Sequence, residues 1–184
     1  MTTFTVDGDR VTLHGEDSGT GPAVLLLHGL SATRRYVLHG STALEREGYR
    51  VIAYDSRGHG ESSPAPSPGD YRYDHLAADA LRVLGARGVD RAALVGMSMG
   101  SAVAAAVALD HPDRVAALVA ITPAHLGTPT RDPARWDRLA TGLAEGGADG
   151  FVQAYGDPGV PPKSLELIRT VMRQRMSRHA HPAA

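Results

Sequence analysis

One stretch of this sequence, Leu94 to Ser101, constrains the fold more than any other. It reads Leu-Val-Gly-Met-Ser-Met-Gly-Ser, so an apolar run leads into a G-x-S-x-G pentapeptide, and a run of small residues follows. A serine hydroxyl is a weak nucleophile unless it is exposed on a sharp turn beside a base. Gly96 and Gly100 flank Ser98 where such a turn brings the backbone too close for side chains. The stretch therefore predicts a strand, a tight turn that presents Ser98, and a helix.

Apolar runs bounded by turn residues alternate with helical patterns, which indicates buried strands joined through helices. The expected strands are residues 3–6, 10–14, 23–28, 50–55, 91–95 and 115–121. The expected helices are residues 36–47, 73–87 and 98–109, and a Gly-rich turn is expected at 16–22. Helical crossovers join parallel strands. The predicted fold class is therefore α/β: a three-layer α/β/α sandwich whose mostly parallel sheet carries an antiparallel N-terminal hairpin.

The pattern of the chain changes after Thr122. Short, polar helical pieces punctuated by Gly and Pro are expected near residues 133–142, 148–155 and 163–177. No further strand-like run follows in the sequence. We therefore divide the chain into a core of residues 1–122 and a partial helical cap, or lid, of residues 123–184.

The composition is that of an ordinary globular domain, with 184 residues, 42% of them apolar and 21% charged. The absence of cysteine excludes disulfides, thiolate metal sites and a cysteine nucleophile. A net charge of −1 argues against nucleic-acid binding, and no run approaches the ~18 apolar residues of a membrane span. The sequence also carries no signal-peptide pattern and no metal or cofactor motif. We expect a soluble, cytoplasmic protein without a cofactor or a metal.

Three motifs, in this order, resemble those of the α/β-hydrolase fold family. They are His28-Gly-Leu30 after one strand, Asp55-Ser-Arg-Gly-His-Gly-Glu-Ser62 after the next, and Gly96-Met-Ser-Met-Gly100 at the turn. Together with the hairpin they cover residues 3–123. The chain is most similar to the small esterases, enol-lactonases, carbon–carbon bond hydrolases and cofactor-free perhydrolases of that family.

This resemblance implies a serine hydrolase that acts on a small ester, lactone or related acyl substrate. Ser98 would be the nucleophile that forms the acyl-enzyme, and its turn would be the nucleophile elbow. The backbone N–H groups of Met99 and Leu30 would form the oxyanion hole. The side chains of Met99 and Leu30 would line an apolar pocket floor.

The acid and the histidine of the family's triad follow the nucleophile, on loops after two later strands. We therefore expect this chain to be an N-terminal portion that lacks the last strands. His111 is expected at the far end of the sheet from Ser98, and His179 and His181 in a frayed tail. His125 follows the last expected strand and is a candidate for an improvised base.

Two other functions stay open at this point. A catalytically inactive α/β-hydrolase fragment could fold and bind a ligand or a partner. Alternatively, another chain could supply the missing strands together with the acid and the base. An active nucleophile needs a base held within hydrogen-bond reach and oriented by a third group, so the position of that base separates these alternatives.

Structural roles are expected for the other polar residues of the motifs. His28 would shape the oxyanion turn rather than carry a proton. Arg57 and His59 would hold the loop after the second parallel strand in place. Asp55, at the end of that strand, would cap the same loop rather than pair with a base.

The last expected strand leads to a prediction about the chain in solution. If the chain ends at Ala184, residues 115–121 form an exposed hydrophobic edge, and such edges pair with other chains. We predict that the isolated 184-residue chain is poorly soluble or self-associates through this strand. Light scattering measures the association, and a stable monomer would contradict the prediction.

Overall fold

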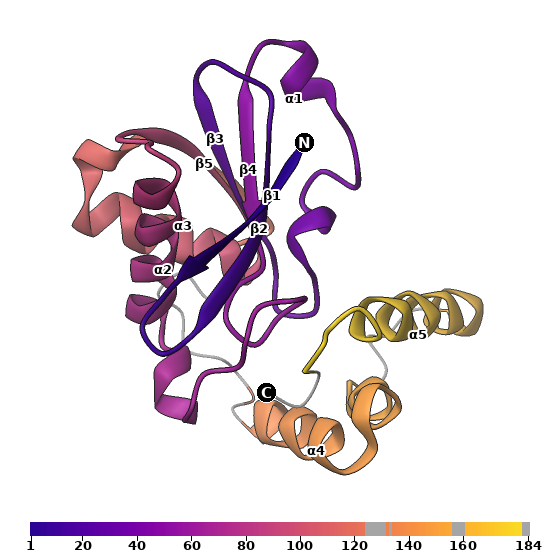
Figure 1. Ribbon diagram of the computed structural model, residues 1–184. Helices are drawn as coiled ribbons and strands as arrows, with labels where there is room; N and C mark the ends of the chain where they lie inside the picture. Colours follow the sequence, from indigo (N-terminus) through magenta and orange to yellow (C-terminus); the bar gives the residue numbers. More distant parts are fainter. Residues whose placement is uncertain (124–131, 133, 156–160, 182–184) are drawn as a thin grey trace.

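The computed structural model of the protein describes residues 1–123, 132, 134–155 and 161–181. In this part of the chain, six strands form one sheet in the order β1-β2-β4-β3-β5-β6 (Figure 1). The strands are β1 Thr2–Asp7, β2 Thr12–Ser18, β3 Ala23–Leu27, β4 Arg50–Tyr54, β5 Ala92–Met97 and β6 Val115–Ile121. The predicted α/β fold class is confirmed, and the bounds of the last strand are those expected from the sequence.

The pairing of the strands brings the functional motifs to one edge of the sheet. β3 pairs in parallel with β4 and β5, and β5 with β6, whereas β1, β2 and β4 pair antiparallel as the expected hairpin edge. The carboxyl ends of β3, β4, β5 and β6 therefore share one edge. This edge is the usual ligand-binding position of open α/β sheets, and it carries the loops that contain the three sequence motifs.

Helices cover both faces of the sheet. Figure 1 shows α2 (Tyr73–Ala86) and α3 (Met99–Asp110) together on one side, where they bury the largest hydrophobic cluster. The opposite face packs against a 3-10 turn (Arg34–Tyr36) and the short α1 (Ala43–Arg46), over a smaller cluster. Two further 3-10 turns lie at Pro68–Tyr71 and Pro112–Arg114.

The predicted helix over residues 36–47 is wrong. It breaks into the 3-10 turn and α1, because His39 and Gly40 between them have φ angles of 49° and 79°. A right-handed helix cannot contain residues in this left-handed conformation. The layer on this face of the sheet is therefore thin.

The predicted turn over residues 16–22 is also wrong at its start, since β2 continues to Ser18 and buries two carboxylates. Asp17 accepts hydrogen bonds from Arg50 (2.6 Å) and Arg87 (2.9 Å). Burial alone would raise the pKa of Asp17, but the two arginines outweigh it and lower this pKa. Glu16 is held in the same way by Arg34 and Arg35. These ion pairs allow the strand to continue where the sequence predicts an exposed turn.

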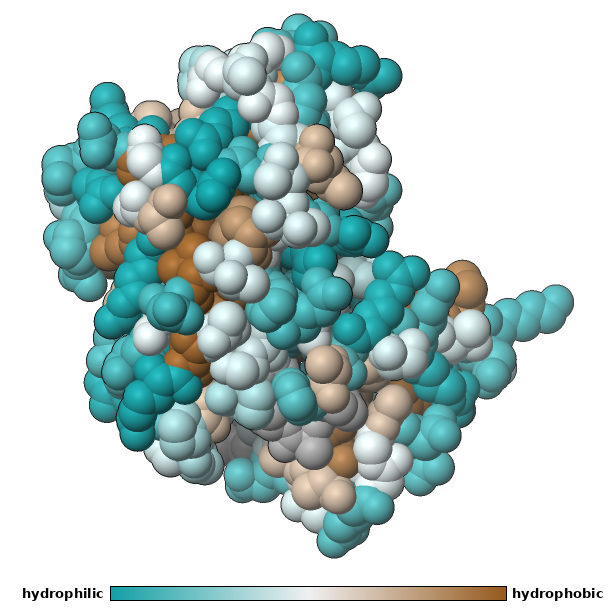
Figure 2. All heavy atoms as spheres, viewed as in Figure 1, coloured by the Kyte–Doolittle hydropathy of each residue, from teal (hydrophilic) through white to brown (hydrophobic). Residues whose placement is uncertain are grey.

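The segment after the sheet consists of α4 (Ala134–Ala154) and α5 (Pro162–Met176). α4 is kinked at Gly147, which separates the two helical pieces that the sequence predicts there. The two helices bury a cluster of their own: Leu139, Phe151, Val152, Met172 and Met176. Hydrophobic residues form one band on the core in Figure 2 and are scattered over these helices. The separate cluster agrees with a division near residue 122, which stays a prediction.

No helix in the described ranges is both long and apolar enough to cross a membrane. β6 is the last strand of the described sheet and leaves Leu118, Val119 and Ile121 each more than one-third exposed. Self-association through this edge stays a prediction.

Two glycines allow α3 to begin directly against the ends of β3 and β5. A Cβ atom on Gly100 would lie 2.1 Å from the carbonyl oxygen of Leu27, and one on Gly96 would lie 2.3 Å from the carbonyl oxygen of Gly100. Both distances are shorter than any tolerated contact, and in each case the neighbour is backbone. Any side chain at either position would push the helix away from the sheet.

We expect Gly100→Ala to lower the free energy of unfolding by about 1–3 kcal/mol, as overpacking usually does. Gly85→Ala is the matched control, since Gly85 lies inside α2 with open space where its Cβ would be. Alanine is the better helix former, so Gly85→Ala should raise that free energy by up to about 1 kcal/mol. Urea unfolding followed by circular dichroism measures both changes. Equal stability of the two variants would contradict the close contact.

Candidate active site

Ser98 lies on a strained turn between β5 and α3. Its φ of 52° and ψ of −113° are unusual for a residue with a side chain. Such conformations cost about 1–3 kcal/mol and persist only where the surrounding structure imposes them. Here the Ser98 N–H donates to the carbonyl oxygen of Ile121 (2.9 Å), and the Ser98 carbonyl accepts from the Ser101 N–H (3.0 Å). The Ser101 hydroxyl donates to the carbonyl oxygen of Gly96 (2.7 Å). These bonds hold the turn that presents Ser98 at the carboxyl edge of the sheet.

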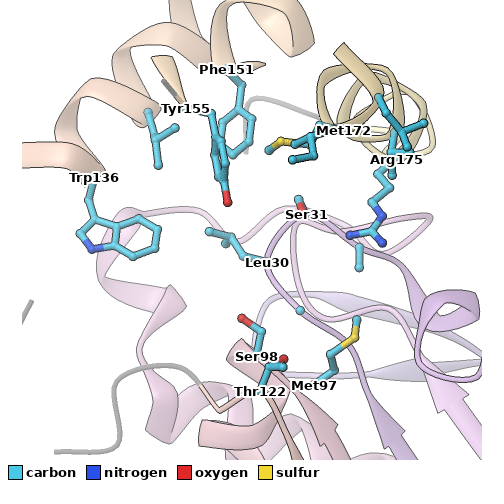
Figure 3. Close-up of a pocket in the computed structure, with 16 residues that line it drawn as sticks. Leu30, Ser31, Met97, Ser98, Thr122, Trp136, Phe151, Tyr155, Met172 and Arg175 are labelled. Carbon is cyan, nitrogen blue, oxygen red and sulfur yellow. The ribbon is translucent and has the colours of Figure 1, made fainter. Parts of the chain in front are cut away.

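A cavity of about 560 Å³ lies over Ser98, between the sheet edge and the two cap helices (Figure 3). Its size is typical of small-molecule sites. The core side is formed by Gly29, Leu30, Ser31, Ala32, Met97, Ser98 and Thr122. The cap side is formed by Trp136, Leu139, Phe151, Tyr155, Leu167, Ile168, Val171, Met172 and Arg175. The walls are mostly apolar, with a few hydroxyl groups and one guanidinium.

The two amides expected to form an oxyanion hole lie on neighbouring elements. Met99 is the first residue of α3, so its N–H has no acceptor within the helix. Leu30 lies in the loop after β3, and neither amide donates to another group among residues 1–123. The Leu30 side chain lines the pocket as expected. The expectation for the Met99 side chain is wrong: it is buried in the core under α3, and Met97 lines the pocket instead.

His28 connects the loops after β3 and β4. Its Nδ1–H donates to the carbonyl oxygen of Gly29 (2.8 Å), and its Nε2 accepts from the Ser56 N–H (2.9 Å). Burial, and next the neighbouring His59, lower the pKa of His28 to about 3. The ring is therefore neutral with both nitrogens engaged, which is the structural role expected for it.

Asp55, Arg57 and His59 hold the loop after β4. Asp55 is fully buried, accepts a hydrogen bond from the Arg34 N–H (2.7 Å) and forms an ion pair with the Arg34 guanidinium. Arg57 makes a bidentate, buried pair with Asp79 (2.8 and 2.9 Å). The sequence does not predict the role of Arg34, because nothing local indicates that it pairs with the buried carboxylate that follows β4.

The ring nitrogens of His59 face two carbonyl oxygens, those of Arg57 (2.9 Å) and Leu30 (2.7 Å). A neutral imidazole carries one N–H and donates to one of these oxygens at a time. With the proton on Nε2, the bond to Leu30 crosses from the loop after β4 to the loop after β3. It fixes the peptide that follows the Leu30 amide. His59 therefore holds its loop as expected, and in addition restrains the residue whose N–H faces the pocket.

The described histidines do not supply a base for Ser98. No group in the described ranges hydrogen-bonds to the Ser98 hydroxyl. His111 lies just after the far end of α3, as expected, and is exposed. His181 is exposed near the end of the described chain, and His125 lies outside the described residues.

The expectation that His179 lies in a frayed tail is wrong. Its Nδ1 accepts from the Gly60 N–H (3.1 Å), and the Ala180 N–H donates to the carbonyl oxygen of Gly60 (2.8 Å). Its ring also meets the edge of His59 at 5.4 Å between ring centres. Burial, and next His59, lower the pKa of His179 to about 4. The tail is therefore fastened to the loop after β4 by contacts that a local pattern does not reveal.

The lowered pKa values of His28 and His179 make the free energy of unfolding depend on pH. Their pKa values, about 3 and about 4, lie below the ordinary 6.5, so the unfolded chain binds more protons than the folded chain below about pH 6.5. We expect the free energy of unfolding to fall as the pH drops from about 7 to about 4.5. His28→Gln should reduce this slope, and His111→Gln, at an exposed histidine, should keep it. Urea unfolding across this range measures it; an unchanged slope in His28→Gln would contradict the assignment.

Known proteins are similar to this chain. Epoxide hydrolase 1 of Siraitia grosvenorii is 36% identical over 170 residues, which are 90% of this chain and 51% of that protein. A protein of Caulobacter segnis named as a carbamate hydrolase is 39% identical over 121 residues, 66% of this chain and 45% of that protein. The chain thus spans about half the length of these curated relatives.

A solved structure described as an N-acyl homoserine lactone degrading enzyme is 27% identical and has a TM-score of 0.71. The match covers 94% of this chain and 65% of that one. Residues 22–161, which include the Ser98 turn and α4, match the family model described as the alpha/beta hydrolase fold. This match spans most of the sequence, and the chain therefore belongs to the α/β hydrolase fold family.

Proposed function

We propose that the protein is a serine hydrolase that cleaves a small ester, lactone or related acyl substrate through an acyl-enzyme on Ser98. The observation that carries this proposal is the position of Ser98: a strained, tightly bonded turn aims it into a cavity of about 560 Å³. Strained residues of this kind cluster at active sites. The mostly apolar walls suit the hydrocarbon part of an acyl substrate.

In the proposed reaction, the Ser98 oxygen attacks the substrate carbonyl and negative charge develops on the carbonyl oxygen. The N–H groups of Met99 and Leu30 are the proposed donors to that oxygen, and the first turn of α3 adds the positive end of its dipole. One such donor is typically worth about 10²- to 10³-fold in rate. His59 contributes by holding the Leu30 peptide through its carbonyl oxygen.

The base that takes the Ser98 proton, and the acid that orients this base, are proposed to lie outside the described residues. His28 is unsuited to the role, since both of its nitrogens are bonded within the loops after β3 and β4. His179 accepts at Nδ1 from the Gly60 N–H and makes no hydrogen bond to Ser98 in the described ranges. The candidates for the base are His125, which lies outside the described residues, and a histidine supplied by a longer form of the protein or by a second chain. The core of residues 1–122 and the cap of residues 123–184 are proposed as the two functional parts of this arrangement.

The chemistry of the nucleophile favours acyl substrates over epoxides, although some relatives are named as epoxide hydrolases. If the Ser98 oxygen opened an epoxide, the product would be an ether, which water does not cleave under mild conditions. An acyl group on Ser98 is an ester, and a carbamoyl group is likewise hydrolysable. The names of the carbamate hydrolase and of the lactone-degrading enzyme agree with this class.

A second candidate function is a catalytically inactive module that binds a ligand or a partner. The observation that favours it is the Ser98 hydroxyl, which has no hydrogen-bond partner among the described residues. A serine without a base keeps its ordinary, low nucleophilicity. The pocket would then serve for binding alone.

Covalent labelling separates the two functions. We expect a fluorophosphonate probe to label the chain at Ser98, and p-nitrophenyl acetate to give a burst of nitrophenol. Ser98→Ala should abolish the labelling and reduce the hydrolysis to background. Ser177→Ala, at an exposed serine of the cap, should leave both unchanged. Equal hydrolysis by the wild-type chain and Ser98→Ala would contradict the proposal and favour the binding module.

A further inference from the structure

The pocket over Ser98 contains one charged side chain among its described lining residues, that of Arg175. Arg175 lies in the last turn of α5, on the cap side. Figure 3 shows its guanidinium group pointing from the helix towards the core side of the pocket, in the direction of Met97. The charge therefore lies on the wall opposite the sheet edge that carries Ser98.

Arg175 has no acidic partner among the described residues. Its guanidinium carbon lies over the ring of Tyr36, at 4.9 Å from the ring centre, and its Nε is buried without a hydrogen-bond partner in the described part of the chain. Arg173, two residues earlier in α5, pairs with Asp149 at 2.6 Å. Arg178 lies over the same Tyr36 ring at 5.3 Å. Two cations thus share one aromatic ring, and no acidic residue of the described ranges compensates the positive charge at the pocket.

An uncompensated cation beside apolar walls is costly, because the walls cannot replace its hydration. Stacking on Tyr36 stabilises the face of the guanidinium but leaves the N–H groups along its edge free to donate. A carboxylate matches that edge, since it accepts two parallel hydrogen bonds from one guanidinium. A group with a single negative charge also balances the one cation that lines the pocket.

We propose that Arg175 is a specificity-determining residue that selects acyl substrates bearing a carboxylate. The carboxylate would bind Arg175 on the cap side, while the carbonyl to be cleaved lies at Ser98 on the core side. The apolar residues between them hold the hydrocarbon chain that joins the two groups. This inference rests on the proposed function only for the identity of the reacting group, because the recognition of the carboxylate requires no catalysis.

The test measures binding to the full 184-residue chain carrying Ser98→Ala, so that no ligand is consumed. The two probes are monobenzyl glutarate and its methyl ester, benzyl methyl glutarate, which differ in the negative charge. We expect calorimetry to give at least about tenfold tighter binding of the monobenzyl ester, a factor that corresponds to about 1.4 kcal/mol. Added salt should weaken this preference, because charge–charge attraction is screened.

The matched variants are Arg175→Gln and Arg169→Gln, each added to Ser98→Ala. Both remove one positive charge from α5, but Arg169 is not among the residues that line the pocket. We expect Arg175→Gln to bring the two affinities to nearly the same value and Arg169→Gln to keep the preference. Circular dichroism confirms that each variant is folded.

Equal binding of the two esters, no binding of either, or a preference that survives Arg175→Gln would each overturn the inference. Labelling of the wild-type chain by the neutral fluorophosphonate tests the proposed function separately. If Ser98 is labelled but the carboxylate preference is missing, the role of Arg175 fails alone. If the preference is present but Ser98 is not labelled, the proposed hydrolase activity fails and the carboxylate site stands.

Discussion

The contact between the first turn of α3 and the ends of β3 and β5 is the constraint on which the rest of the site depends. Gly96 and Gly100 lack side chains where a Cβ atom would lie about 2 Å from backbone oxygens. Because the helix begins this close to the sheet, the residue between strand and helix has to adopt a positive φ. That residue is Ser98, and the same geometry turns the Met99 N–H away from any acceptor in the helix.

A second set of contacts fixes the loops that complete the core side of the site. The loop after β3 and the loop after β4 are cross-linked twice, through His28 to Ser56 and through His59 to Leu30. The buried pair of Arg57 with Asp79 anchors the second loop to α2. His28, Arg57 and Asp79 are buried, so breaking one of their contacts would leave a buried group unpaired. The peptide of Leu30 is therefore positioned by residues from two other segments of the chain.

The features that the sequence predicted well are those set by local patterns. The strand at Val115–Ile121, the turn at Ser98 and the order of the elements follow from apolar runs and glycines that act over a few residues. The helix over residues 36–47 failed because two adjacent residues, His39 and Gly40, adopt left-handed angles that helical periodicity does not exclude.

The features that the sequence did not predict depend on partners distant in the chain. β2 continues through Glu16 and Asp17 because arginines from other segments neutralise both carboxylates. His179 is buried because Gly60 offers it a backbone N–H across the fold. Arg175 reaches the pocket only because α5 packs on α4 over the sheet edge. In the sequence, Arg175 looks like any charged residue on the exposed face of a helix, so its position at the pocket is not predicted.

The hydrogen bond between the Ala180 N–H and the Gly60 carbonyl oxygen affects how the fold tolerates insertions and deletions. The chain leaves the sheet at the end of β6 and returns at this hydrogen bond, so the cap is a loop closed at both ends on one edge of the sheet. The free-energy cost of closing a loop grows only with the logarithm of its length, by about 0.6 kcal/mol for each doubling. Insertions or deletions in the cap would therefore cost the core little stability. The pocket over Ser98 can therefore change its size and lining while the turn that holds Ser98 keeps its conformation.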